Sequence, residues 1–336
     1  MNSDAPDPSL PSELPDASAN SVVKIFIGSD GLRAGWGILL FLFFCIALSI
    51  SASLLQTLLF PHSFGAIAFN TPRGLFLGEG RMLAVVTLAT LVMAKIERRP
   101  FAAYGFALRR GLRNFSAGLV WGLALLSLLV FALRASGLLV FDARLLHGTA
   151  ALRYAAIWLV GFLLVGLFEE SSFRGYLQFT LARGISGASR LLGARHSDAI
   201  GFWTAAMLLS FGFGFSHHTN PGESPIGLIA AALIAIVFCL SLWRTGSLWW
   251  AIGFHAAWDW AESFLFGVSD SGTVMVGRLF ATHPSGHALL SGGLTGPEGS
   301  LYILPIVVLA SAVIFFTLPT IRATNQPHNG LGSIDI

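Results

Sequence analysis

Charged side chains are scarce in this sequence of 336 residues: Asp, Glu, Lys and Arg make up 11% of it, against 54% hydrophobic residues. Water-soluble domains carry roughly 25% charged residues, so the composition excludes a fully water-exposed surface. The net charge of +3 is too small for a basic nucleic-acid-binding surface, and we expect no nucleic-acid partner. Both cysteines, Cys45 and Cys239, lie within apolar stretches, which excludes a disulfide framework and a cysteine zinc site. With a mean hydropathy of +0.73, the chain is predicted to be an integral membrane protein in contact with the lipid bilayer.

Apolar segments close to the length of a membrane-spanning helix, about 20 residues, recur along the chain. There are eight, and they lie near 35–60, 80–96, 115–138, 154–182, 199–217, 226–243, 246–266 and 301–319. We therefore predict an all-α fold, a polytopic transmembrane helix bundle of about eight spans. Residues 267–300 hold many Gly and Ser residues and are predicted to form a long loop.

The predicted domain organisation is one membrane domain between two tails. Residues 1–22, rich in Pro, Ser and Asp, are predicted to be a disordered N-terminal tail without signal-peptide features. The transmembrane domain is expected at 23–320, with its polar motifs in 150–265, and 321–336 are expected to be a short C-terminal tail. Fourteen of the twenty Lys and Arg residues fall on the side of the bundle that holds the loop between the second and third segments. Because positive charge is retained in the cytoplasm, we predict a multi-pass cell-membrane protein with both termini cytoplasmic.

Three polar motifs interrupt the apolar segments, although ionisable side chains inside a bilayer are costly and usually functional. They are Glu169-Glu170-x-x-x-Arg174, Phe213-x-x-x-His217 and His255-x-x-x-Asp259. Helix positions i and i+4 share a face, so Glu170 is expected to pair with Arg174. Glu169 lies about 100° further round the helix, on the face of Ser172, Phe173 and Tyr176, and has no basic residue one turn away. It is therefore a candidate general base.

The depth of these groups in the membrane depends on helix length. If the helix that carries Glu169 continues to about Gly184 and the next begins near Ala199, Glu169 and His217 lie roughly 22 Å and 27 Å from the turn. An antiparallel pair would then hold both at a similar depth. If the helix ended near Arg174 instead, they would lie at opposite membrane faces. A carboxylate and two imidazoles brought together could activate water and stabilise an oxyanion, or could bind a metal.

On these residues the sequence resembles the CPBP intramembrane protease family, also called Abi or CAAX-protease-like, which is related to the Ras-converting CAAX endopeptidase. That family is marked by E-E-x-x-x-R, F-x-x-x-H and H-x-x-x-N/D, in this order on separate membrane helices. The flanks 173–178 and 98–106 are also similar to the family, and the resemblance covers about 95–265. It implies a membrane-embedded endopeptidase, of the CAAX prenyl protease type, that hydrolyses peptide bonds with glutamate-activated water. The implied substrate is a hydrophobic or membrane-anchored peptide or protein.

The resemblance also implies residue roles. Glu169 would be the catalytic glutamate, His217 its partner, and His255 with Asp259 would hold the oxyanion or the water. Asp259 stands where the eukaryotic relatives have asparagine, so it would be protonated, orient His255 or ligate a metal. The cofactor question stays open between none and zinc, whose ligands would be Glu169, His217, His255 and Asp259. No H-E-x-x-H motif is present, and we expect a metal not to be essential.

Several alternatives stay open at this point. Glu170 and Arg174, which the resemblance assigns to shaping the site, would also be explained as a salt bridge that holds the bundle together. We expect His218 to be a neighbour at the interface and Glu262 to be a polar interior residue. The chain could instead be a non-catalytic membrane scaffold, or a bacteriocin-immunity-type protein, on the same fold. A proton-coupled transporter is a further alternative, against which the lack of two matching broken-helix halves argues.

Overall fold

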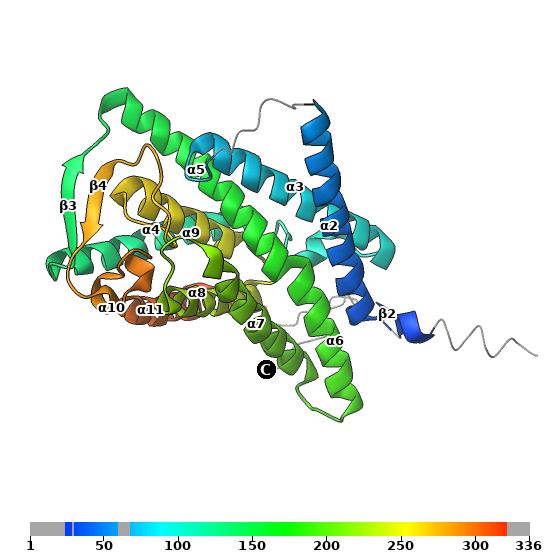
Figure 1. Ribbon diagram of the computed structural model, residues 1–336. Coiled ribbons are helices and arrows are strands. Elements are labelled where there is room, and N and C mark those ends of the chain that lie inside the picture. Colours follow the sequence, from blue (N-terminus) through cyan, green and yellow to red (C-terminus); the bar gives the residue numbers. More distant parts are fainter. Residues whose placement is uncertain (1–23, 29, 60–67, 321–336) are drawn as a thin grey trace, which may run out of the picture.

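The computed structural model describes residues 24–28, 30–59 and 68–320, so both predicted tails lie outside the described residues. The fold is a bundle of helices (Figure 1), which confirms the predicted all-α class. The main helices are α2 (Ala34–Leu59), α3 (Pro72–Glu97), α4 (Gly111–Ala135), α5 (Gly148–Glu170), α6 (Gln178–Leu191), α7 (Ser197–Ser216), α8 (Pro225–Thr245), α9 (Trp249–Trp260) and α11 (Ile303–Thr317). Short helical segments are η1 (Phe101–Tyr104), η2 (Ser171–Leu177), η3 (His217–Thr219), η4 (Ala261–Phe266), α10 (Ala288–Ser291) and η5 (Pro297–Gly299).

Six helices of the described chain are long and apolar enough to cross a membrane. They are α2, α3, α4, the continuous helix Gly148–Leu191, the helix Ser197–Thr219, and α8. The two remaining predicted segments contain α9 with η4, and α11, which are shorter helices. The chain is therefore a multi-pass membrane protein, whereas the count of about eight spans stays a prediction.

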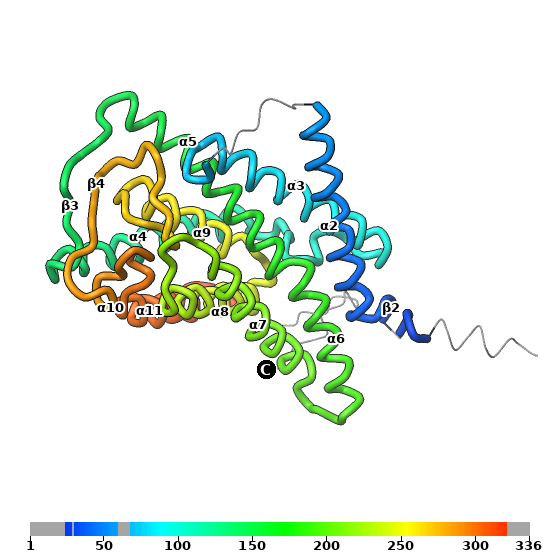
Figure 2. The backbone as a smooth tube through the Cα atoms, in the orientation of Figure 1, coloured from blue at the N-terminus to red at the C-terminus, as the bar shows by residue number. Residues whose placement is uncertain are grey.

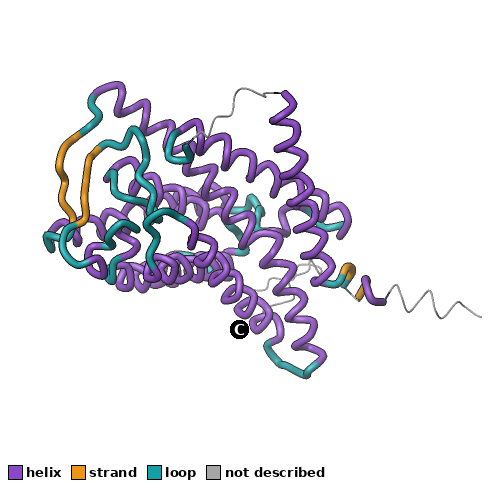
Figure 3. The backbone as a smooth tube through the Cα atoms, viewed as in Figure 1, coloured by secondary structure: helices purple, strands orange, loops and turns teal. Residues whose placement is uncertain are grey.

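The segment 267–300, predicted to be a loop, contains regular structure. Its strand β4 (Phe280–Pro284) pairs antiparallel with β3 (Leu139–Arg144), so that Phe141 lies opposite Thr282 (Figure 3). A second small sheet joins β1 (Ile27–Gly28) to β2 (Gly31–Leu32). The loop prediction is wrong at β4 because the pairing partner lies about 140 residues earlier in the chain, where a strand was not predicted either.

Helix α9 runs through the middle of the bundle, between α4, α5 and α8 (Figure 2). Its side chains Trp250, Phe254 and Trp258 are almost completely buried. Close approach to α4 depends on small residues, because a Cβ at Gly118 would overlap the carbonyl of Trp250 and one at Gly122 that of Phe254. Small residues that let two backbones touch are typical of membrane helix interfaces. This packing fixes the position of the helix that carries the third polar motif.

The helix that carries Glu169 is long, as the depth argument requires. Segments α5, η2 and α6 form one helix of 44 residues, which ends at Leu191 rather than near Gly184. Helix α7 begins at Ser197 and packs along α6 as an antiparallel hairpin (Figure 1). The first and second polar motifs therefore lie on neighbouring helices that run in opposite directions.

Candidate active site

The first motif lies where α5 changes into a π turn. Glu169 and Glu170 end α5, and η2 follows with a non-helical backbone at Gly175 (φ −81°, ψ −112°). A π turn holds one extra residue, which rotates everything after it by about 100°. The expectation that Tyr176 shares the face of Glu169 is therefore wrong: Tyr176 is buried elsewhere and donates a hydrogen bond of 2.8 Å to Glu97 Oε1. Insertions of this kind are frequent at functional sites.

The Glu170–Arg174 pair is confirmed, and it has a second partner. Arg174 Nη1 lies 3.1 Å from Glu170 Oε1, and both side chains are buried. The same Oε1 accepts a hydrogen bond of 3.0 Å from His255 Nδ1. The guanidinium carbon of Arg174 also lies 4.3 Å from the centre of the Phe213 ring. One carboxylate oxygen thus connects the first motif to the third, while the arginine contacts the second.

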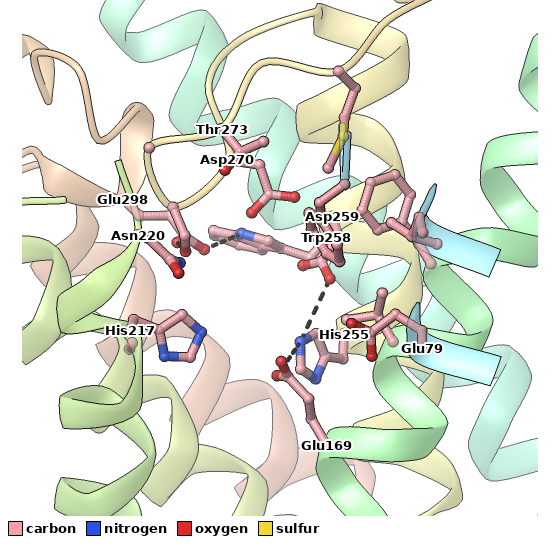
Figure 4. A pocket seen from close by; sticks show the side chains of 18 of the residues that line it. Glu79, Glu169, His217, Asn220, His255, Trp258, Asp259, Asp270, Thr273 and Glu298 are labelled. Carbon is pink, nitrogen blue, oxygen red and sulfur yellow. Dashed lines mark hydrogen bonds and ion pairs between the residues drawn. The ribbon is translucent and has the colours of Figure 1, made fainter. Parts of the chain in front are cut away.

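His255 is surrounded by carboxylates at both ring nitrogens. Its Nε2 lies 3.5 Å from Glu169 Oε2 and 3.5 Å from Asp259 Oδ2 (Figure 4). Only an imidazolium donates from both nitrogens, and three facing carboxylates favour that charged form. Of the roles expected for Asp259, the position beside Nε2 supports orienting His255.

The two ring nitrogens of His217 have different surroundings. Its Nδ1 donates to the carbonyl of Phe213, one turn earlier, at 2.9 Å. The Nε2 atom can therefore interact with a molecule in the cavity that His217 lines. The Phe213 ring lies 4.9 Å from the His217 ring and 6.3 Å from the His255 ring, edge-on to both. The F-x-x-x-H spacing therefore supplies both the acceptor that orients His217 and the aromatic surface between the two histidines.

A cavity of about 730 Å³ unites the predicted catalytic side chains. Glu169, His217, His255 and Asp259 all line it, and they come from the three separate motif-bearing helices (Figure 4). The rest of the wall combines polar side chains with apolar ones, among them Phe162, Val165, Phe254 and Met275. Glu170 and Arg174 do not line the cavity; they lie behind His255 and hold it. His218 also lies outside, with its ring stacked on Phe215.

The polar cavity residues that sequence analysis missed include Glu79, Asn220, Asp270 and Glu298. Glu79 lies within α3, and an acidic residue inside an apolar helix was a detectable signal. Asn220 follows His217 by one 3₁₀ turn. Burial is the main cause that raises the pKa of Asp270 to about 6 and that of Glu298 to about 7, and the charge of Asp270 raises the latter further. The fold brings these two loop residues to the site, and no local pattern indicates it.

The predicted zinc ligands fit a metal poorly in this arrangement. Among the described residues, three ligand atoms lie within 4.8 Å of one another only in the set Glu262, Asp270 and Glu298. Glu169, His217, His255 and Asp259 form no such group. The chemistry of the four residues is therefore derived without a metal.

Comparison with known proteins gives one match. Residues 150–261, about a third of the chain, match the family model described as Rce1-like, type II CAAX prenyl endopeptidase. No curated protein and no solved structure matches the chain. The matched segment includes the three polar motifs, from Glu169 to Asp259. Over these residues the chain is similar to the Rce1-like CAAX protease family, which supports the family that the motifs indicate.

Proposed function

We propose that the protein is a membrane-embedded endopeptidase in which Glu169 activates the attacking water. The observation that carries the proposal is the convergence of Glu169, His217, His255 and Asp259 on one cavity. The side chain of Glu169 is 21% exposed, whereas that of Glu170 is completely buried. Only the first of the paired glutamates is therefore accessible to water and to a substrate.

The geometry supports a general-base mechanism. Glu169 takes a proton from water, and the hydroxide attacks the carbonyl carbon of the peptide bond. The negative charge that develops on the carbonyl oxygen is stabilised by the imidazolium of His255. His217 Nε2, which accepts because Nδ1 donates to the Phe213 carbonyl, holds the attacking water from across the cavity. When the carbon–nitrogen bond breaks, Glu169 gives its proton to the leaving amine. Glu170 contributes by fixing the His255 ring through Nδ1.

The cavity wall supports a substrate with apolar side chains or a lipid anchor. Phe162, Val165, Phe254 and Met275 provide apolar surface beside the polar centre. The matching family model is described as a type II CAAX prenyl endopeptidase, and we propose a hydrophobic or membrane-anchored peptide here. A prenylated and an unprenylated version of one peptide, compared in the same assay, distinguish a prenyl requirement from a general preference for apolar side chains.

Cleavage by protein purified in detergent tests the proposal. Glu169→Gln is expected to abolish cleavage of a fluorogenic hydrophobic peptide, and His217→Gln to reduce kcat strongly. His218→Gln is the matched control, because this neighbouring histidine lies outside the cavity and its loss should leave cleavage unchanged. Retained cleavage in Glu169→Gln contradicts the mechanism. A scaffold or immunity protein would tolerate the substitution, and a transporter would show substrate flux in liposomes without cleavage.

A further inference from the structure

Three carboxylates from separate segments meet beside the cavity. Glu262 comes from η4, Asp270 from the turn after it, and Glu298 from η5. One oxygen of each lies within 4.8 Å of one oxygen of the other two. Asp270 and Glu298 also face the cavity, where Figure 4 shows them opposite His217. The mechanism proposed above uses none of the three.

Glu262 is the most unusual member of this carboxylate cluster. It is completely buried, and within the described part of the chain neither of its carboxylate oxygens has a hydrogen-bond partner. Among the residues that the structure describes, none of the three carboxylates forms an ion pair with Lys, Arg or His. A buried carboxylate without a partner is strongly unfavourable. The cluster therefore has to be neutralised, either by protons or by a bound cation.

The other two carboxylates are each held by one oxygen. Trp258 Nε1 donates to Glu298 Oε1 at 2.6 Å, and Ser263 Oγ donates to Asp270 Oδ2 at 2.8 Å. Asp270 Oδ1 makes no side-chain hydrogen bond among the described residues, and Glu298 Oε2 has only a long contact of 3.4 Å with Ser271 Oγ. Both side chains are thus oriented while an oxygen of each remains available.

The backbone of the cluster is tightly connected. Gly296 has a φ of +109°, and a Cβ there would overlap the carbonyl of Ser269, next to Asp270. The amide of Gly272 donates to the carbonyl of Thr295 at 2.9 Å. The segments that carry Asp270 and Glu298 are therefore held against each other without the help of a ligand, and the three carboxylates are preorganised.

We propose that Glu262, Asp270 and Glu298 bind a divalent cation of the Ca²⁺ type beside the cavity. A donor set made of carboxylate oxygens alone, without His or Cys, selects hard cations. The cation supplies the positive charge that the buried Glu262 lacks. This site is separate from the catalytic side chains, and its existence does not depend on the proposed peptidase activity.

Thermal unfolding in a non-ionic detergent, without lipid headgroups that bind calcium, tests the proposal. After treatment with EDTA, CaCl₂ is expected to raise the Tm saturably and more than NaCl of equal ionic strength, with one Ca²⁺ per chain in calorimetry. Glu262→Gln should bind Ca²⁺ at least tenfold more weakly while keeping or raising the Tm in EDTA, because it removes a buried charge without changing shape. Glu169→Gln is the matched control and should keep the full response.

Three outcomes would overturn the proposal. One is the absence of saturable Ca²⁺ binding to the wild-type protein. Another is an unchanged Ca²⁺ response in both Glu262→Gln and Asp270→Asn, which would place the ion elsewhere. The third is a response lost in Glu169→Gln but kept in Glu262→Gln, which would move the ion to the catalytic side chains. Because the readouts are Tm and calorimetry, a failure of the proposed peptidase activity leaves this test intact.

Discussion

Replacing Glu170 with glutamine would remove the charge that Arg174 pairs with, while keeping the size of the side chain and one acceptor oxygen for His255. Loss of one partner of a buried ion pair costs about 3–5 kcal/mol, because the remaining charge is left without compensation. Both side chains here are 1% exposed or less. The Phe213 ring 4.3 Å from the guanidinium carbon retains part of the stabilisation, since a desolvated cation–π contact contributes about 2 kcal/mol. We therefore expect Glu170→Gln to lower the free energy of unfolding by about 3 kcal/mol, the lower end of that range.

At about 2 °C per kcal/mol for a chain of this size, Glu170→Gln should lower the Tm in detergent by about 6 °C. Adding Arg174→Met should restore part of the lost Tm, because the unpaired guanidinium is then removed as well. The effects of the two substitutions are therefore not additive. Glu169→Gln is the control next in sequence, since Glu169 pairs with no Lys or Arg among the described residues. A Tm for Glu170→Gln equal to that of the wild type, or a double variant whose loss is the sum of both single losses, would refute the reasoning.

Three further predictions concern catalysis, packing and topology. Glu169→Gln should keep the wild-type Tm and lose cleavage, as measured by unfolding and peptide hydrolysis on one preparation; a low Tm would show that Glu169 is structural. Gly118→Val should destabilise the protein by about 1–3 kcal/mol or more through overlap with Trp250, whereas Gly212→Val, where a Cβ meets nothing within 4 Å, should be neutral; equal losses for both would contradict the packing argument. A reporter fused to the C-terminus should be active in the cytoplasm, and a signal from the opposite side would refute the orientation predicted from the charge distribution.

Features that depend on residues close together in the sequence could be predicted from the sequence. The apolar segments predicted the helices, and the i, i+4 spacing predicted the pair of Glu170 and Arg174. A helix that continues well beyond Arg174, one of the two alternatives considered, predicted that Glu169 and His217 lie at a similar depth. The link between Glu170 and His255 could not be read from spacing, because it joins two helices 85 residues apart.

Other features depend on long-range contacts or small backbone changes. The π turn after Glu170 shifts Tyr176 by about 100°, and nothing in the apolar pattern indicates an inserted residue. Strand β4 exists because β3 pairs with it, and Asp270 and Glu298 reach the cavity because the segment between η4 and α11 folds back over it. Glu79 was detectable as a charge in an apolar helix, but the predicted span began one residue after it.

The 44-residue helix is about 66 Å long, roughly twice the 30 Å hydrocarbon core of a bilayer. Even when tilted, it must extend well into water at one end or both, and the end carried by α6 forms a hairpin with α7 (Figure 1). A displacement of this hairpin would be transmitted along α6 to η2, because the other half of the long helix, α5, is packed against α9. The π turn interrupts the regular hydrogen-bond pattern of that helix directly after Glu170, one residue beyond Glu169. Bending would concentrate there, so a force applied in the aqueous phase would be converted into a displacement of the carboxylate that faces His255.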